Sequence, residues 1–236
     1  MCGRGRRRGY RRGVSSPVAD LRSYLAGLSW PDPQAPRFDP DTAPADPVEL
    51  FAQWLEAAVE AGAPAPHVMT LATVDAAGRP DARVTVLEDV DESAFWVAAS
   101  ETSPKGKQLG RVPVAALVFH WPSLGRQVRV RGAVRPAEAA RTAAAFERLS
   151  AHQRADLLAD RQSGPLHDEV WLSDALGDPT ELLALEGAGP VTAPTWRLWG
   201  VDAGRMEFFQ AERDGHHVRL RYSRSESGYG TELLHP

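Results

Sequence analysis

Hydrophobic side chains between residues 48 and 59 recur at the spacing of an α-helix. Asp46 precedes this stretch as a candidate N-cap, and Pro47 suits the first helical position because that position needs no backbone N–H. Gly62 marks the expected end of the helix. The apolar stripe comprises Val48, Phe51, Leu55, Ala58 and Val59, with Trp54 beside it.

Short apolar runs separated by turn sequences follow, which is typical of antiparallel strands. In residues 127–131 valines and arginines alternate, so the two kinds of side chain face opposite sides of a strand. We predict strands over residues 69–74, 81–88, 94–99, 113–121, 127–131, 195–202, 205–210 and 217–224, turns at 75–80, 89–92 and 122–125, and helices over 137–149, 151–159 and 168–186. This order predicts an α+β chain, an antiparallel barrel or sandwich with flanking helices.

No linker divides the chain after residue 47, so we expect one domain over residues 47–236 behind a flexible arm, residues 1–46. Residues 1–13 hold six arginines and four glycines, a composition that opposes packing. Residues 30–47 carry six prolines and are expected to be an extended lead-in. A solvated tail is the simpler interpretation of the arginines, and an arm for nucleic acid or an anionic surface is the alternative.

Composition narrows the class of protein. The formal net charge is -4, which argues against nucleic acid as the main partner. The only cysteine is Cys2, so no disulfide can form within the chain and a cytoplasmic location is expected. No apolar run is long enough for a membrane-spanning helix.

Several kinds of functional site are disfavoured by the motifs. The seven histidines show no spacing typical of a metal site, and His216 and His217 point to opposite faces of a predicted strand. The chain has no nucleophile elbow, no phosphate-binding loop of the Gly-x-x-x-x-Gly-Lys type and no Rossmann glycine pattern. We therefore expect no metal and no nicotinamide bound in the Rossmann manner.

The kind of site that the sequence does support is an anion-binding site. Ser103 can cap a short helix that begins at Pro104, and Lys105 lies in its first turn. A helix N-terminus presents unpaired N–H groups and a partial positive charge, which suit a phosphate. Arg83, on the strand of residues 81–88, is a second cation that could reach it.

The order of these elements resembles the pyridoxamine 5′-phosphate oxidase family of split-barrel FMN proteins. The resemblance runs from about Phe51 to Pro236. Its most specific parts are Met69-Thr-Leu-Ala-Thr-Val74, Arg126-Gln127-Val128 and the closing Leu234-His-Pro236. It implies a homodimer with FMN bound in clefts between the subunits.

The resemblance also implies the cofactor contacts. Arg83 and Lys105 would bind the FMN phosphate, with Ser103 and Val84 beside them; Gln127 would bond the isoalloxazine edge; Gln162 and Ser163 would reach across from the other subunit; Phe209 would supply an aromatic wall and Arg219 would lie at the polar ring edge. Two departures are Ala98-Ala99, where the family has an aromatic–threonine pair, and Pro104, where it has an arginine. The second removes one phosphate ligand.

The substrate side departs further from the vitamin B6 oxidases. The family's four phosphate-binding residues are matched by Glu88, Ala145, Leu149 and Gln153, and its Arg-x-His pair keeps only His217. A carboxylate repels a phosphate ester. Glutamate at this place, and a segment like Ser103–Lys107, are instead similar to the phenazine-biosynthesis flavin oxidases, and the alanine-rich residues 137–146 suit a fused ring system.

The expected function is an FMN-dependent oxidase that dehydrogenates a reduced nitrogen heterocycle in natural-product biosynthesis, with dioxygen as acceptor and hydrogen peroxide as product. His217 is the candidate for proton handling or substrate orientation, and Glu88 for pairing with a cationic ring nitrogen. The alternatives are a pyridoxamine/pyridoxine 5′-phosphate oxidase and a non-enzymatic flavin- or haem-binding split barrel. A deazaflavin is the alternative cofactor.

Overall fold

The computed structural model describes residues 21, 24–28, 36–150, 153–154, 157, 163, 193–212 and 215–235. The chain divides into two units, Met1–Asp32 and Pro33–Pro236, and the second contains the whole sheet. The predicted helices over 151–159 and 168–186 lie largely or entirely outside the described residues. The helical elements of the second unit whose full extent is described are η1 (Pro40–Thr42), α2 (Pro47–Glu60), α3 (Pro104–Arg111), η2 (Pro122–Leu124) and α4 (Ala139–Glu147).

The described strands form one ten-stranded antiparallel sheet. The strands are β1 (Val68–Val74), β2 (Pro80–Val86), β3 (Asp89–Val90), β4 (Ala94–Ser100), β5 (Val114–Trp121), β6 (Arg126–Pro136), β7 (Trp196–Asp202), β8 (Arg205–Gln210), β9 (Val218–Ser225) and β10 (Gly228–Leu233). One path runs β10-β9-β8-β6-β5-β1-β2, and β6 also pairs with β7, which leads through β4 to β3. The α+β antiparallel prediction is confirmed.

Strand β6 belongs to both branches of the sheet. Its first residues pair with β8, up to Arg131 opposite Arg205, and its last three pair with β7, beginning with Val134 opposite Val201. Gly132 lies at the transition, where a Cβ would be 1.9 Å from the carbonyl oxygen of Asp202. The close approach of the two backbones therefore requires glycine at this position.

Two sequence predictions about strands fail. The predicted turn at residues 89–92 contains the two-residue strand β3, which pairs with β4. Strand β10 was missed because its glycines and exposed polar residues give no alternating pattern. Backbone pairing with β9 forms it, together with Tyr229, whose ring packs on the core and whose hydroxyl donates to the carbonyl of Ala203.

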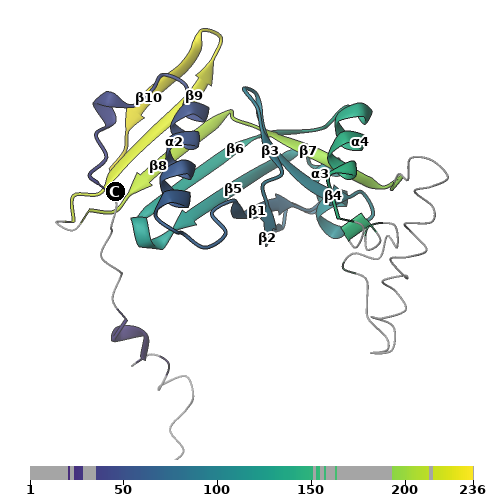
Figure 1. Cartoon of the computed structure of the whole chain (residues 1–236), viewed down its shortest axis with the longest axis horizontal. Helices are drawn as coiled ribbons and strands as arrows, with labels where there is room; N and C mark the ends of the chain where they lie inside the picture. The colour runs from purple at the N-terminus through teal and green to yellow at the C-terminus, as the bar shows by residue number, and fades with distance from the viewer. Residues whose placement is uncertain are drawn as a thin grey trace, which may run out of the picture. The chain divides into compact units, whose positions relative to one another are not determined.

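Helix α2 covers the core face of the sheet (Figure 1). Asp46 caps it as predicted, since its carboxylate accepts the N–H of Val48, and Gly62 follows its end with a positive φ. Its buried side is set by Phe51 and Trp54, while Val59, expected in the apolar stripe, is 60% exposed. The buried face is thus rotated toward Trp54, which meets Phe208 edge to face.

Part of the proline-rich lead-in packs on the sheet. Phe38 is buried against Trp54, with ring centroids 5.2 Å apart. The carbonyl of Pro36 accepts a hydrogen bond from Gln210, and that of Pro44 accepts one from Tyr222. The expectation of an unpacked lead-in is therefore wrong for this stretch, because Phe38 gains a hydrophobic site.

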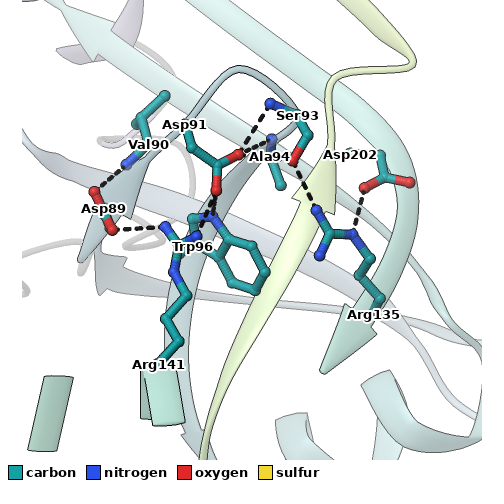
Figure 2. A network of polar contacts seen from close by, with 9 residues as sticks. All are labelled: Asp89, Val90, Asp91, Ser93, Ala94, Trp96, Arg135, Arg141 and Asp202. Carbon is teal, nitrogen blue, oxygen red and sulfur yellow. Dashed lines mark hydrogen bonds and ion pairs between the residues drawn. The ribbon is translucent and has the colours of Figure 1, made fainter. Parts of the chain in front are cut away.

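A polar network holds α4 to the sheet beside β3 and β4 (Figure 2). Arg141 of α4 forms ion pairs with Asp89 and Asp91, both at 2.6 Å, and lies 4.1 Å over the ring of Trp96. Arg135 lies over the same indole at 4.8 Å. Trp96 also donates its N–H to Asp91, so one carboxylate joins the strand turn, the indole and the helix.

Asp91 is the central acceptor of this network. Besides Trp96 and Arg141, it accepts the backbone N–H and hydroxyl of Ser93 and the N–H of Ala94. Burial opposes ionisation, but the hydrogen bonds from Ser93, Trp96 and Arg141 hold the pKa of Asp91 well below its ordinary value. The ionised carboxylate of Asp91 is therefore more stable in the folded protein than in the unfolded chain.

A first prediction compares two glycines of α3. In Gly106→Ala the new Cβ would lie 2.0 Å from the carbonyl oxygen of Ser100. We expect destabilisation by about 2 kcal/mol or more, although alanine is the better helix former. The matched control is Gly110→Ala, whose Cβ would meet only the Trp199 ring at 3.6 Å. The free energy of unfolding of this control, measured in denaturant, should rise by no more than about 1 kcal/mol. Equal stability of the two variants would contradict the close approach.

A second prediction concerns Asp91→Asn. We expect a loss of about 2 kcal/mol in the free energy of unfolding at pH 7, because charge-assisted hydrogen bonds are weakened. Since the folded-state pKa is depressed, the wild-type advantage is fully present above the unfolded-state pKa and declines as the pH falls below about 4. Denaturation of wild type and variant at several pH values measures this difference in stability. Glu92→Gln, one residue away and exposed, is the control and should show no such dependence.

Candidate functional site

The N-terminus of α3 is built as the sequence predicted. Ser103 is the N-cap and Pro104 the first helical residue. The Ser103 hydroxyl donates to the carbonyl of Ser100 at 2.7 Å and accepts the N–H of Gly106 at 3.2 Å, and the side chain is buried. Ser103 therefore shapes the helix start, and its hydroxyl is occupied by the chain itself.

Arg83 of β2 is held against α3 and the end of β1. Its guanidinium donates to the hydroxyl of Thr73 at 2.6 Å and to the carbonyl of Leu71 at 3.2 Å. It also donates to the amide oxygen of Gln108 at 3.0 Å and to the carboxylate of Asp81 at 2.5 Å. These four acceptors fix the position of the guanidinium.

Lys105 lies near this guanidinium in the first turn of α3. Burial, and in addition the positive charge of Arg83, lower the pKa of Lys105 below its ordinary value. Both side chains are cationic, and although Asp81 already pairs with Arg83, an anion bound beside the two cations would be stabilised by their charges. The structure thus brings together Arg83, Lys105 and the α3 N-terminus.

Gln127, Phe209 and Arg219 form a row across three strands. Gln127 of β6 is directly opposite Phe209 of β8, which is directly opposite Arg219 of β9. Directly opposed residues share one face of a sheet. The core residues Val128 and Phe208 alternate with this row, so the row lies on the face turned away from α2 and the core, which we call the outer face.

His217 lies beside this row. Its ring centroid is 5.5 Å from that of Phe209, and its Nδ1 accepts the backbone N–H of Glu212 at 3.0 Å. A neutral imidazole that accepts at Nδ1 carries its proton on Nε2. His217 is therefore arranged to donate a hydrogen bond from Nε2, which suits orientation of a ligand better than removal of a proton.

Arg219 is held by two acceptors of its own chain. It donates to Glu207 at 2.8 Å and to the carbonyl of His235 at 3.0 Å. Glu207 also accepts from Arg129 at 3.3 Å. Two of the five N–H donors of Arg219 are used in this way, and three remain for a ligand.

The two candidate clusters are on opposite faces of the sheet. Arg83 is in register with Leu71, which aligns through Leu117 with Val130 of β6. Gln127 is three residues from Val130 and so faces the other way. The separation is about 10 Å along the strand and about 14 Å across three strand spacings. One chain therefore does not bring Arg83 and Gln127 to the same small ligand.

The candidate substrate residues gather near the C-terminal end of α4. Although Glu88 is exposed, partial burial of its carboxyl raises its pKa, while the charges of Arg148 and His67 act in the opposite direction. The repulsion of a phosphate ester expected from the sequence rests on this carboxylate alone, and the charge of Arg148 reduces that repulsion. Ala145 is buried in a cluster with Trp96 and Trp196, and Leu149 packs against it.

The remaining candidates are less informative. Gln153 forms a capping box with Ser150, in which the amide oxygen accepts the Ser150 N–H and the Ser150 hydroxyl accepts the Gln153 N–H. Val84 is 70% exposed on the outer face of β2. Ser163 has a φ of 65°, and Gln162 lies outside the described residues. The contact roles of these four residues stay predictions.

Three residues of these clusters were not predicted. Gln108 is three residues after Lys105 on the same side of α3, a spacing that the sequence does show. Glu207 is two residues before Phe209 and thus shares its face of β8. Thr73 has no sequence signal, because only the β1–β2 register brings it to Arg83.

Within the described part of the chain, no three His, Cys, Asp or Glu side chains are grouped in a way that could hold a metal ion. Over the same residues, none of the helices has the length and apolar character needed to cross a bilayer.

The comparisons with known proteins agree with this architecture. Residues 55–176 match the family model described as pyridoxamine 5′-phosphate oxidase. The pyridoxine/pyridoxamine 5′-phosphate oxidase of Caulobacter vibrioides is 38% identical over 81% of this chain and 85% of its own length. The protein of the same name from Herminiimonas arsenicoxydans is 32% identical over 91% of this chain and 96% of its own.

Solved structures show the same fold. PhzG from Burkholderia lata 383, in complex with tetrahydrophenazine-1-carboxylic acid, superposes with a TM-score of 0.77 at 29% identity over 86% of this chain and 99% of its own. A pyridoxamine 5′-phosphate oxidase-related, FMN-binding protein from Nostoc punctiforme has a TM-score of 0.63 at 20% identity, covering 82% of this chain and 98% of its own. The extent of these matches shows that the chain, a split barrel, belongs to the pyridoxamine 5′-phosphate oxidase family.

Proposed function

We propose that two copies of this chain bind FMN between them and act as an FMN-dependent oxidase of a reduced nitrogen heterocycle. The observation that carries the proposal is the attachment of Arg83 to α3 through Gln108, which lies three residues after Lys105 on the same side of the helix. Two cations beside the N–H groups of a helix start form a site for a dianionic phosphate. The donor set therefore fits the phosphate of FMN.

The separation of the two clusters supports a homodimer. Arg83 and Lys105 of one copy would hold the phosphate, and Gln127, Phe209 and Arg219 of the other would meet the ring. Three exposed valines lie on the outer face that carries this row, Val84 at 70%, Val86 at 37% and Val114 at 46% exposure. Exposed apolar groups that share a face favour burial against a second copy.

When bound, FMN would accept a hydride from the substrate and return the electrons to dioxygen, which becomes hydrogen peroxide. The chain's own residues bind and orient. Phe209 would cover the ring, and the cationic Arg219 would favour negative charge at its polar edge. His217 would donate its Nε2–H to the substrate, as its bond to Glu212 implies.

The chemistry of Glu88 and α4 supports this substrate class. A carboxylate at this position would pair with a cationic ring nitrogen, and the neighbouring Arg148 limits the excess negative charge. Ala145 is buried in the cluster of Trp96 and Trp196, and Leu149 packs against that cluster, so this end of α4 is apolar and would suit a flat fused ring better than a phosphate ester. The complex of PhzG with a reduced phenazine carboxylic acid supports a related substrate.

A second candidate function is oxidation of pyridoxine or pyridoxamine 5′-phosphate. The names of the curated relatives favour it, and Arg148 would give a phosphate one cation beside Glu88. By the resemblance, Ala145, Leu149 and Gln153 would stand where the B6 oxidases bind the substrate phosphate, and none of them would offer a charge. We therefore rank this function second.

A third prediction tests the cofactor site. The double variant Arg83→Ala/Lys105→Ala should lose about 3 kcal/mol of FMN affinity, roughly a hundredfold increase in Kd, because two charge-assisted contacts to the phosphate are removed. Fluorescence titration of the apoprotein with FMN measures it. Lys107→Ala, an exposed lysine of the same helix, is the control and should bind like wild type. Unchanged affinity of the double variant would overturn the assignment, as would wild-type protein that binds no FMN or that prefers a deazaflavin.

A fourth prediction tests the substrate. In wild-type protein loaded with FMN and kept free of oxygen, tetrahydrophenazine-1-carboxylic acid should reduce the flavin and bleach its absorbance. Pyridoxine 5′-phosphate should reduce the flavin far more slowly. Glu88→Gln should lower kcat/KM for the heterocycle roughly tenfold through loss of one ion pair and leave the Kd for FMN unchanged. Faster reduction by pyridoxine 5′-phosphate would establish the second candidate. Flavin that neither compound reduces would favour the non-enzymatic flavin- or haem-binding alternative.

A further inference from the structure

Charged side chains form a ladder across four strands of the outer face. The strand registers place Arg129 of β6 opposite Glu207 of β8, Glu207 opposite Arg221 of β9, and Arg221 opposite Glu232 of β10. Arg221 and Glu232 form an ion pair. Opposite charges thus alternate from strand to strand, which stabilises the pairing.

Glu207 is the central acceptor of this ladder. Its side chain is only 11% exposed. One carboxylate oxygen accepts from Arg219 at 2.8 Å and from Arg129 at 3.3 Å, and the other lies 3.5 Å from the same Arg129 nitrogen. Two guanidinium groups therefore share one carboxylate, and neither is fully neutralised.

The surroundings of Glu207 are strongly cationic. A cavity of about 210 Å³ opens over it, lined by Leu234 and five arginines. Glu207 is the only carboxylate among the described residues that line this cavity. The five arginines are Arg129, Arg131, Arg205, Arg219 and Arg221. Because Glu207 is nearly buried, removing its charge would change the local electrostatic potential more than removing an exposed carboxylate elsewhere on this face.

Arg219 connects this ladder to the proposed flavin. It is the end of the Gln127–Phe209–Arg219 row, where the proposed function places the ring. A guanidinium at the ring edge favours the anionic reduced flavin, and a carboxylate 2.8 Å behind it opposes that effect. The group Arg129, Glu207 and Arg219 carries a net charge of about +1, and it would carry about +2 without Glu207.

We propose that Glu207 is a positioning residue: it fixes the guanidinium of Arg219 and, through it, lowers the reduction potential of the bound flavin. This inference rests on the proposed function, because it requires a flavin beside Arg219. A lower potential makes reoxidation by dioxygen more favourable and slows reduction by substrate. Glu207 would thus set the balance between the two half-reactions without touching the substrate.

The fifth prediction is that Glu207→Gln shifts the midpoint potential of bound FMN to a more positive value. The same variant should bind sulfite about tenfold more tightly, since the sulfite adduct of flavin is anionic and no carboxylate would then oppose the charge of the Arg219 guanidinium at the ring edge. Dye equilibration and absorbance titration measure the two effects. Glu232→Gln removes the same charge from the same ladder, but Glu232 pairs with Arg221. This control should leave the midpoint potential close to that of wild type and the Kd for sulfite within about twofold of the wild-type Kd.

The double variant Glu207→Gln/Arg219→Ala distinguishes action through Arg219 from direct action. If Glu207 acts through Arg219, adding Glu207→Gln to Arg219→Ala should produce little further shift. A full additional shift, or an unchanged potential in Glu207→Gln, would overturn the inference. Should Glu207→Gln fail to fold, Glu207→Asp must raise the potential in its place, because it withdraws the carboxylate from Arg219. Wild-type protein without FMN affinity would instead refute the proposed function.

Discussion

The double pairing of β6 is the constraint on which the remaining architecture depends. The first half of this strand carries Gln127 and Arg129 toward β8 and β9, and its last three residues turn the chain toward β7 and β4. Gly132 allows the change because the backbone of Asp202 passes where a side chain would be. The outer-face row and the α4 region thus both take their positions from one strand, and a shift in its register would displace both.

The faces of the sheet divide the functional residues into two groups. Arg83 belongs to the face that packs on α2 and reaches α3 at the edge of the barrel, whereas Phe209 and Arg219 belong to the outer face. Because side chains in a strand alternate between faces, this division is fixed by the register and does not depend on loop conformation. A ligand that contacts both groups would therefore need two chains, which is the arrangement that the proposed function requires.

Elements with a local signal could be predicted from the sequence. The capped helices after Asp46 and Ser103 and most strands required only nearby residues. What failed depended on distant pairing. Strand β10 exists because β9 offers a free edge, and Phe38 is buried because Trp54 and Phe208 leave a site for it. The anion site of Arg83, Ser103 and Lys105 could be proposed from local signals, and the other cofactor candidates came from the resemblance. The contacts that hold these candidates, such as Glu207 with Arg219, required the register of three strands.

Helix α4 is attached to the sheet by charge and by apolar contact at one residue. Arg141 pairs with Asp89 and Asp91 and lies over the indole of Trp96, and Ala145, one turn later, is buried in the cluster that contains the same indole. Because both kinds of contact meet on one tryptophan, its loss would remove the apolar seat and the guanidinium platform together. Substitutions at Trp96 and on this face of α4 should therefore be non-additive, so this part of the fold can change only through coupled substitutions.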